Sequence, residues 1–339
     1  MPTYGFDATY SVGRNLSGVG VYSRELMWEL TRLHAKDARW YFYYRPNRLL
    51  RSIKDRLPRG VKRRLLQGAP RVDLFHALNQ RVDHPARRTV TTFHDLFVMT
   101  SEYSTPDFRA RFTQQAREAA KRSDAIISVS QFTADHIERL LGVEPKRIHI
   151  VPHGVHVPPA SQVARENLVL FSGVIQKRKN LARVVKAFEQ LPAGWRLVVA
   201  GGQEGYGAAD ELRAVEESPR RGDIRLAGHV SRSDLDALYA RARVLAFPSL
   251  DEGFGMPILE AMANGVAVVT SRISAMPEVA GDAALLVDPL NVDEIAHALL
   301  RAATDDELRA RLIPKGLDRA RQFSWEDAAE KTWQVYQTL

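Results

Sequence analysis

The sequence predicts an α/β protein with two domains, each built on a parallel sheet. Short β-branched runs alternate with amphipathic helical stretches, which is typical of parallel strands covered by helices on both faces. These runs are too many for one ordinary doubly wound sheet. The length of 339 residues also exceeds one typical hydrophobic core, so two domains are expected.

The expected elements follow from hydrophobic periodicity along the chain. No strand is expected before Gly18, where a helix begins. Strands are expected at 89–93, 125–130, 148–151, 168–173, 196–202, 244–249, 266–271 and 284–289. Helices are expected at 108–122, 131–141, 180–191, 232–242 and 257–264, and a last helix follows Ser324 as its N-cap.

Residues 152–167 are rich in proline and polar groups and carry no periodic pattern, so they are expected to be a linker. The predicted domains are therefore 1–160 and 165–322.

Composition excludes several classes of site. The chain has no cysteine, which excludes disulfides, iron–sulfur clusters and thiolate zinc sites. The N-terminus lacks the basic and apolar segments of a signal peptide. No apolar run approaches the ~20 residues that span a bilayer. A soluble, cytoplasmic protein is expected.

Much of the net charge of +8 comes from residues 45–71, which hold ten Arg or Lys and one acid, Asp55. Apolar residues at every fourth position predict one helical face, and Pro58 and Gly60 divide the segment into two short helices. These helices either cover a sheet with solvated arginines outside, or hold the protein on an anionic membrane. Nucleic acid is not expected, because the segment lacks interleaved aromatic residues and a recognised module.

Two motifs in the first half could face a ligand. Gly18 and Gly20 open a helix and could let backbone amides approach an anion, although a tight turn is the more common explanation of such a pair. His94 follows the strand at 89–93 and could face a cleft, or be a structural histidine satisfied by a backbone partner.

Two motifs in the second half carry more chemistry. Lys177, Arg178 and Lys179 lie between a strand and a helix, where cations could neutralise a diphosphate; the alternative is a solvated basic loop. Glu252 lies in the loop after the strand at 244–249, and Glu260 lies one turn into the following helix. The alternatives are a favourable charge near a helix N-terminus for Glu252 and a surface position for Glu260.

The turn between these glutamates, Gly253, Phe254 and Gly255, could present bare amides to a ligand. Because the two carboxylates come from different elements, they would contact different parts of one extended ligand.

These motifs together resemble retaining glycosyltransferases of family 4, which have the GT-B fold of two facing Rossmann-like domains. The resemblance covers nearly the whole chain and is most specific in "RKN" (178–180) joined to "EGFGMPILE" (252–260). It implies sugar transfer from a nucleotide sugar, and the "RKN" subgroup makes GDP-mannose the expected donor. The implied acceptor is a glycan or a lipid-linked glycan, and the last helix, 325–339, is implied to pack back on the first domain.

The resemblance also implies roles for single residues. Glu260 would bind the ribose, and Glu252 with the amides of 253–255 would hold the sugar. Arg178 and Lys179 would balance the diphosphate without a metal or other cofactor. His94 would lie near the sugar, and the segment of Gly18 and Gly20 would close over the donor.

The chain departs from the family in two places. Val174 stands where many relatives have Arg or Thr, and His153 replaces the asparagine of the common "PNG". Other functions compatible with these motifs are a nucleotide-sugar epimerase, a glycan phosphorylase, or a non-catalytic nucleotide-sugar-binding partner. No motif for the lysine site of a phosphorylase is evident.

Overall fold

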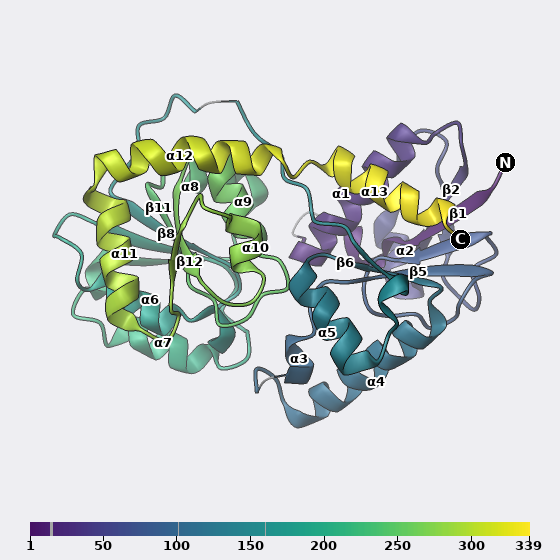
Figure 1. Ribbon diagram of the computed structural model, residues 1–339, viewed down its shortest axis with the longest axis horizontal. Helices are drawn as coiled ribbons and strands as arrows, with labels where there is room; N and C mark the ends of the chain where they lie inside the picture. The colour runs from purple at the N-terminus through teal and green to yellow at the C-terminus, as the bar shows by residue number, and fades with distance from the viewer. Residues whose placement is uncertain (14–15, 101, 160) are drawn as a thin grey trace. The chain divides into compact units, whose positions relative to one another are not determined.

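The computed structural model describes residues 1–13, 16–100, 102–159 and 161–339. The chain divides into two compact units, one formed by Met1–Gly154 with Phe323–Leu339 and the other by Val155–Gln322. Both units are α/β, with parallel sheets flanked by helices (Figure 1). The first boundary lies after Gly154, inside the expected linker; its described residues, 152–159 and 161–167, form no helix or strand.

The first unit has a seven-stranded parallel sheet in the order β3-β2-β1-β4-β5-β6-β7. Its strands are β1 Thr3–Asp7, β2 Arg39–Tyr44, β3 Lys62–Leu65, β4 Leu74–Ala77, β5 Arg88–Phe93, β6 Ala125–Ser128 and β7 Ile148–Ile150. Its helices are α1 Gly18–Leu33, α2 Pro46–Ser52, α3 Phe97–Thr100, α4 Pro106–Arg122, α5 Gln131–Leu141 and α13 Trp325–Gln337, with 3-10 turns at Ala8–Ser11 and Pro145–Arg147.

The second unit has a six-stranded parallel sheet in the order β10-β9-β8-β11-β12-β13. Its strands are β8 Leu168–Ser172, β9 Arg196–Ala200, β10 Ile224–Gly228, β11 Val244–Phe247, β12 Ala267–Ser271 and β13 Leu285–Val287. Its helices are α6 Leu181–Phe188, α7 Ala208–Glu216, α8 Arg232–Arg241, α9 Met256–Ala263, α10 Met276–Ala280, α11 Val292–Thr304 and α12 Asp306–Arg321, with 3-10 turns at Lys177–Lys179 and Arg221–Asp223.

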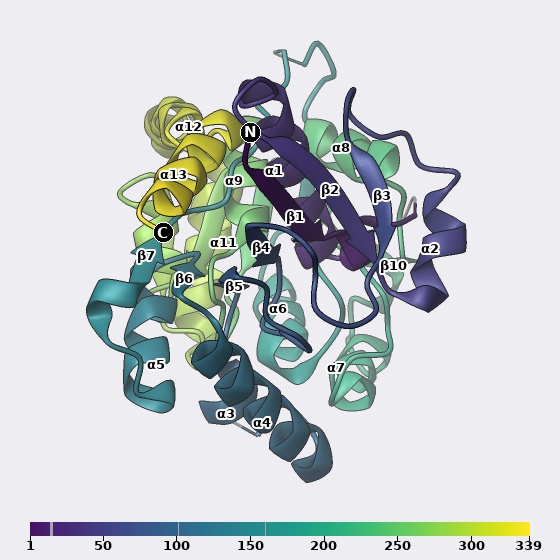
Figure 2. The same ribbon diagram turned by 90° about the vertical axis from the view of Figure 1, so that its right-hand side faces the viewer.

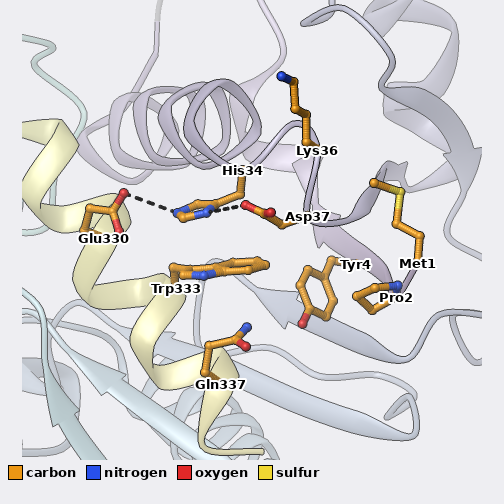
Figure 3. A pocket seen from close by; sticks show the side chains of 9 residues that line it. All are labelled: Met1, Pro2, Tyr4, His34, Lys36, Asp37, Glu330, Trp333 and Gln337. Atoms are coloured by element: carbon orange, nitrogen blue, oxygen red, sulfur yellow. Dashed lines mark hydrogen bonds and ion pairs between the residues drawn. The ribbon is translucent and has the colours of Figure 1, made fainter.

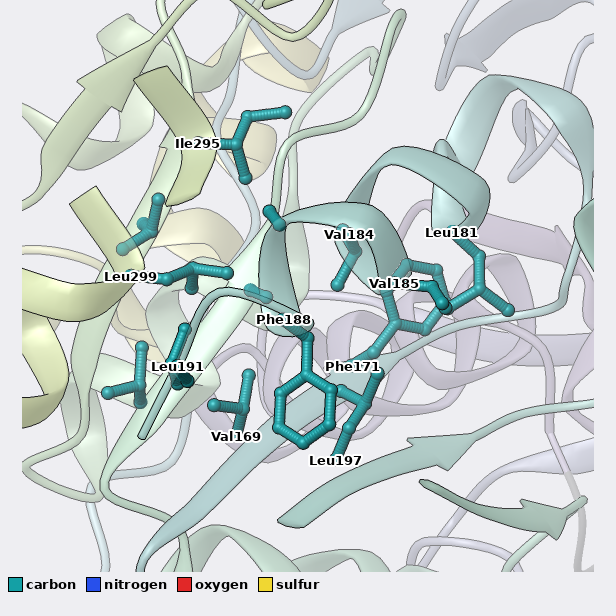
Figure 4. Close-up of a cluster of buried hydrophobic side chains, with 14 of the residues drawn as sticks. Val169, Phe171, Leu181, Val184, Val185, Phe188, Leu191, Leu197, Ile295 and Leu299 are labelled. Atoms are coloured by element: carbon teal, nitrogen blue, oxygen red, sulfur yellow. The ribbon is translucent and has the colours of Figure 1, made fainter. Parts of the chain in front are cut away.

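The core of the second unit explains why most of its strands were easy to predict. All residues of β8, β11 and β12 are buried, as expected for central strands of a sheet covered on both faces. Val184, Val185 and Phe188 of α6 pack with Ile295 and Leu299 of α11 in the same cluster (Figure 4). Continuous Val, Leu and Phe runs of this kind give a strong strand signal.

The first unit contains elements that the sequence did not predict. The expectation of no strand before Gly18 is wrong, because Thr3–Asp7 forms the central strand β1 between β2 and β4. Strands β2, β4 and, in the second unit, β10 were also missed. The segment "TYGFD" includes Gly and Asp, which are depleted in strands, so burial between two neighbours decides its conformation.

The expected second helix of residues 45–71 is also wrong. Pro46–Ser52 is helical, but Lys62–Leu65 is the edge strand β3, paired in parallel with Tyr41–Tyr44. Pairing with β2 outweighs the four-residue apolar spacing.

The last helix belongs to the first unit and lies alongside α1 (Figure 2). Ser324 caps it by accepting a hydrogen bond from the Asp327 amide at 2.9 Å, as predicted. Tyr336 at its other end hydrogen-bonds His76 of β4, with 2.6 Å between the hydroxyl and Nδ1. Gly154 is required here, because a Cβ at this position would lie 2.3 Å from the Trp325 nitrogen.

Candidate functional site

Two loops at the carboxyl edge of the second sheet bring Arg178, Lys179 and Glu252 together. The loop after β8 carries the two cations and the loop after β11 carries the carboxylate, and these strands are neighbours. Glu252 Oε1 lies 2.8 Å from Arg178 Nη1 and 2.5 Å from Lys179 Nζ. The three predicted residues therefore form one ion triad.

The triad is buried, which strengthens its electrostatics. Glu252 and Lys179 are each 7% exposed, so the alternative of a solvated basic loop is wrong for Lys179. Burial alone would raise the pKa of the Glu252 carboxyl, but the charges of Arg178 and Lys179 outweigh it and hold that pKa at about 2. Glu252 is therefore ionised at neutral pH, and the triad carries one net positive charge.

The backbone around the triad is held by its neighbours. Asn180 adopts a left-handed conformation with φ of 67°, and its side-chain amide donates to the carbonyls of Pro248 and Pro289. Arg178 donates to the Asp251 carbonyl at 2.7 Å, and Ser274 accepts from the Glu252 amide at 3.1 Å. These bonds join the four loops that follow β8, β11, β12 and β13 at one sheet edge, which preorganises the cations.

Bare backbone makes room for Lys179. Gly173 has a φ of 134°, and a Cβ there would lie 3.3 Å from Lys179 Cε. A Cβ on Gly201 would lie 1.9 Å from the Gly173 carbonyl oxygen, so both positions require glycine. The Lys179 ammonium lies 4.6 Å from the centre of the Phe247 ring, close enough for a cation–π contact.

Glu260 lies in α9 and is 8% exposed, so its alternative as a surface residue is wrong. Arg232 Nη1 lies 2.5 Å from its Oε1, and the Tyr239 hydroxyl donates to its Oε2 at 3.0 Å. Burial by itself would lower the pKa of the Arg232 guanidinium. The carboxylates of Glu260 and Asp236 outweigh burial, so the pKa is raised. Each carboxylate oxygen retains a second lone pair for a ligand hydroxyl.

Sequence reasoning missed Arg232 and Tyr239. Both come from α8, which contacts β8 in the folded unit, and no local pattern ties them to Glu260. Only the tertiary packing shows this set.

The predicted turn of Gly253, Phe254 and Gly255 lies between the two glutamates. Phe254 is buried, which anchors the turn, and Gly255 has a left-handed φ of 105°. Gly255 is the N-cap of α9, and no side chain caps this end of the helix. The geometry is therefore compatible with the prediction that backbone amides of the turn face a ligand.

Gly18, Gly20 and His94 belong to the first unit. Gly18 is exposed, and a Cβ there would meet nothing within 4 Å. Gly20 is buried, and a Cβ there would lie 2.7 Å from the Tyr10 carbonyl. The Gly20 amide donates to Ser17 Oγ at 3.3 Å, so the glycine here serves packing and its amide serves the cap of α1.

His94 is buried, and both ring nitrogens have partners. Nε2 lies 2.9 Å from the Leu78 carbonyl and therefore donates; Nδ1, 3.3 Å from His153 Nε2, then accepts when the ring is neutral. Burial lowers the pKa of His94 to about 4 and places that of His153 well below its usual value. His94 therefore has the backbone partner that a structural histidine was expected to have, namely the Leu78 carbonyl. Its predicted role near a sugar stays a prediction.

A pocket of about 840 Å³ lies at the amino edge of the first sheet, the edge opposite to the one from which His94 leaves β5 (Figure 3). His34 stacks on Trp333 with 4.1 Å between ring centres, between Asp37 at 3.1 Å and Glu330 at 3.4 Å. None of the predicted site residues lines this pocket. Its contacts join the ends of α1 and α13.

Two further features bear on cofactors and membranes. Among the described residues, no group of three His, Cys, Asp or Glu side chains is placed to hold a metal ion. Every helix in the described ranges is too short or too polar to traverse a bilayer.

Comparisons with known proteins identify the family of this chain. The family model for glycosyl transferases group 1 matches residues 159–319, and that for glycosyltransferase family 4 matches residues 16–157. The O-antigen chain mannosyltransferase B of Escherichia coli is 35% identical over 283 residues, 78% of this chain and 74% of that protein. The serotype-specific mannosyltransferase WbdA of Escherichia coli is 28% identical over 264 residues, 71% of this chain but only 32% of WbdA.

Among solved structures, a sucrose-phosphate synthase from Thermosynechococcus elongatus has a TM-score of 0.80 at 20% identity and covers 100% of this chain and 99% of its own. This likeness shows the fold. Together with the two family models and the relative at 35% identity, it confirms the expected class. The chain belongs to glycosyltransferase family 4 and is a glycosyltransferase with the GT-B fold.

Proposed function

We propose that this enzyme transfers mannose from GDP-mannose, with retention of the anomeric configuration and without a metal, to a glycan or lipid-linked glycan. The observation that supports it best is the Arg178–Lys179–Glu252 triad, a preorganised pair of cations at the carboxyl edge of a parallel sheet. Support for mannose comes from the two mannosyltransferases among the relatives.

The triad suits departure of a nucleoside diphosphate. Breaking the bond between the anomeric carbon and phosphate develops negative charge on the diphosphate oxygen, which Arg178 and Lys179 would stabilise. The phosphate would compete with Glu252 for these cations. The net positive charge of the triad favours binding of the phosphate. This role needs no metal ion.

The same geometry disfavours Glu252 as a covalent nucleophile. Its Oε1 is shared by an ammonium and a guanidinium, and its low pKa reflects a carboxylate stabilised by charge. We infer front-face attack instead: the acceptor hydroxyl oxygen bonds to the anomeric carbon, the bond to phosphate breaks, and the hydroxyl proton passes to the departing phosphate. Glu252 would orient the sugar, and Glu260 would accept hydrogen bonds from the ribose.

The acceptor side would operate at an anionic membrane surface through residues 45–71. Leu50, Ile53 and Leu65 are 76%, 63% and 41% exposed, so they do not cover a sheet as an apolar helical face would. Exposed basic side chains surround them at Arg51, Lys54, Arg56, Arg59, Lys62 and Arg64. Apolar and basic side chains presented together suit an anionic lipid interface.

A donor panel tests the proposal. The full chain is titrated with GDP-, UDP-, ADP- and TDP-sugars by calorimetry, and product is followed with a mannoside acceptor. We expect GDP-mannose to bind most tightly and the product linkage to be α. A preference for UDP-sugars would overturn the donor, and epimerised or phosphorolysed product without a second sugar would overturn transfer.

A further inference from the structure

Four charged side chains form a row at the carboxyl edge of the first sheet. Asp7 ends β1, Arg45 follows β2, and Arg81 and Asp83 lie in the loop after β4. Because β2, β1 and β4 are neighbours in the sheet, these ends meet. We call Asp7, Arg45, Asp83 and Arg81 the Arg–Asp row.

The row alternates in charge from the interior to the surface. Arg45 Nη2 lies 3.4 Å from Asp7 Oδ2, Arg45 Nη1 lies 3.0 Å from Asp83 Oδ2, and Arg81 Nε lies 2.8 Å from Asp83 Oδ1. The inner side chains, Asp7 and Arg45, are 2% and 13% exposed, whereas Asp83 and Arg81 are 42% and 43% exposed. The inner pair thus holds the outer pair in place.

The outer pair is open to a ligand. Among the described residues, Arg81 uses only Nε on a partner, and neither Nη atom makes a hydrogen bond or ion pair. The half-buried Tyr10 interacts electrostatically with Arg81, so an aromatic side chain lies near the outer pair. Ligands of parallel α/β sheets bind beyond the carboxyl ends of the strands, which is where this row lies.

The strand order places the row next to the histidine predicted to lie near the sugar. Strand β5, which leads into His94, is the neighbour of β4, which leads into Arg81 and Asp83. The loops that carry His94 and the row therefore leave adjacent strands of one sheet.

The charge of the row indicates the chemical class of the ligand. Two carboxylates and two guanidinium groups sum to zero, so a phosphate would meet Asp83 as well as Arg81. A sugar hydroxyl both donates and accepts, and a carboxylate beside a guanidinium offers both kinds of partner. We propose that the Arg–Asp row binds an uncharged sugar at the end of the acceptor glycan, so that Arg81 and Asp83 select a neutral acceptor; this inference rests on the proposed function.

Charge changes of opposite sign test this selection. Asp83→Asn gives the row a net positive charge, and Arg81→Gln gives it a net negative charge. Two acceptor probes are methyl α-mannoside and its 6-phosphate, each with GDP-mannose as donor. We expect Asp83→Asn to raise kcat/KM for the phosphorylated probe relative to the neutral one about threefold to tenfold, and Arg81→Gln to lower that ratio.

A matched ion pair serves as control. Arg88 and Asp124 lie at the amino edge of the same sheet, 3.3 Å apart and 51% and 33% exposed. Asp124→Asn should leave the ratio of the two probes unchanged. Ratios that stay constant in both row variants, or that change equally in Asp124→Asn, would overturn the proposal, because a merely structural pair affects both probes alike.

Donor chemistry is read separately. Binding of GDP-mannose without acceptor is measured by calorimetry, and its Kd in Asp83→Asn and Arg81→Gln should match that in Asp124→Asn. If the wild type neither binds nor hydrolyses GDP-mannose, the proposed donor fails. The row is then judged by saturation-transfer NMR of methyl α-mannoside: a signal that weakens in both row variants but not in Asp124→Asn supports it, and equal signals overturn it.

Discussion

Lys179 and Glu252 form a 2.5 Å ion pair between two loops that leave neighbouring strands of one sheet. Both side chains are buried, so their attraction is weakly screened by solvent. The pair explains why a basic motif and an acidic motif so far apart in the sequence act as one site. It also gives several measurable consequences.

Lys179→Ala should reduce the rate of transfer. The variant removes one of two cations from the site of the departing diphosphate, so kcat should fall by about 10²–10³ while KM for the donor changes less. Lys186→Ala is the control, since the Lys186 ammonium is half exposed and, within the described part of the chain, pairs only with Glu189, at 3.2 Å. Steady-state kinetics measure both variants, and equal kcat values in the two would contradict the role of Lys179.

The acid stability of the second unit should depend on Glu252. Its pKa is lowered from 4.5 to about 2 in the folded state, so the native state favours the ionised form. The stabilisation is present above pH 4.5 and is lost as the pH falls towards 2, an amount of about 3 kcal/mol.

Glu252→Gln lacks this titration. Urea unfolding at several pH values between 5 and 2 should therefore give a shallower decline for the variant than for the wild type. Parallel curves would show that the carboxyl titrates normally in the folded chain.

Glu260 should discriminate ribose from deoxyribose. A ribose hydroxyl would donate to the lone pairs of Glu260 left by Arg232 and Tyr239. We expect 2′-deoxy-GDP to bind the wild type about tenfold more weakly than GDP, and Glu260→Gln to bind both with similar, reduced affinity. Calorimetry measures the two nucleotides, and undiminished discrimination in Glu260→Gln would place the ribose elsewhere.

The second unit was predictable because its chemistry lies at the ends of buried, strongly apolar strands. Lys179 and Glu252 follow β8 and β11, whose continuous hydrophobic runs mark them in the sequence. The partners of Glu260 were not predictable, because Arg232 and Tyr239 reach it from α8 only through tertiary packing.

The first unit was harder for a physical reason. Strand β1 has only five residues, including Gly5 and Asp7, and β3 is an exposed basic edge strand. Both depend on pairing with β2, an interaction between segments distant in sequence that a local pattern does not report. The Arg–Asp row follows from that pairing and was missed with it.

His153 should fix the tautomer of His94. Its Nε2 donates to His94 Nδ1, which keeps the proton of His94 on Nε2 towards the Leu78 carbonyl. His153→Asn retains an N–H donor, whereas His153→Leu does not. We expect the nitrogen chemical shifts of His94 and kcat to persist in His153→Asn, and both to change in His153→Leu, kcat by about tenfold. Unchanged shifts in His153→Leu would show that Leu78 alone orients the ring.

Leu50 and Ile53 should govern binding to anionic vesicles. Leu50→Gln with Ile53→Gln removes two exposed apolar side chains, one within α2 and one at its C-cap, and Arg51→Glu with Lys54→Glu reverses two exposed charges. Sedimentation with vesicles of phosphatidylcholine and phosphatidylglycerol measures the partition coefficient. The charge reversal should lower it at least about fivefold, because each basic residue near such a surface contributes about 1 kcal/mol. The double glutamine variant should also lower it, because it removes apolar area that would insert into the interface.

Phe108→Gln is the matched control, since this side chain in α4 of the same unit is 47% exposed. It should bind vesicles like the wild type. Binding of the wild type should weaken as salt rises and vanish with phosphatidylcholine alone, because the attraction is electrostatic before the apolar side chains insert. Equal partitioning of all variants would show that residues 45–71 do not contact the lipid, and the exposed leucine and isoleucine would then require another partner.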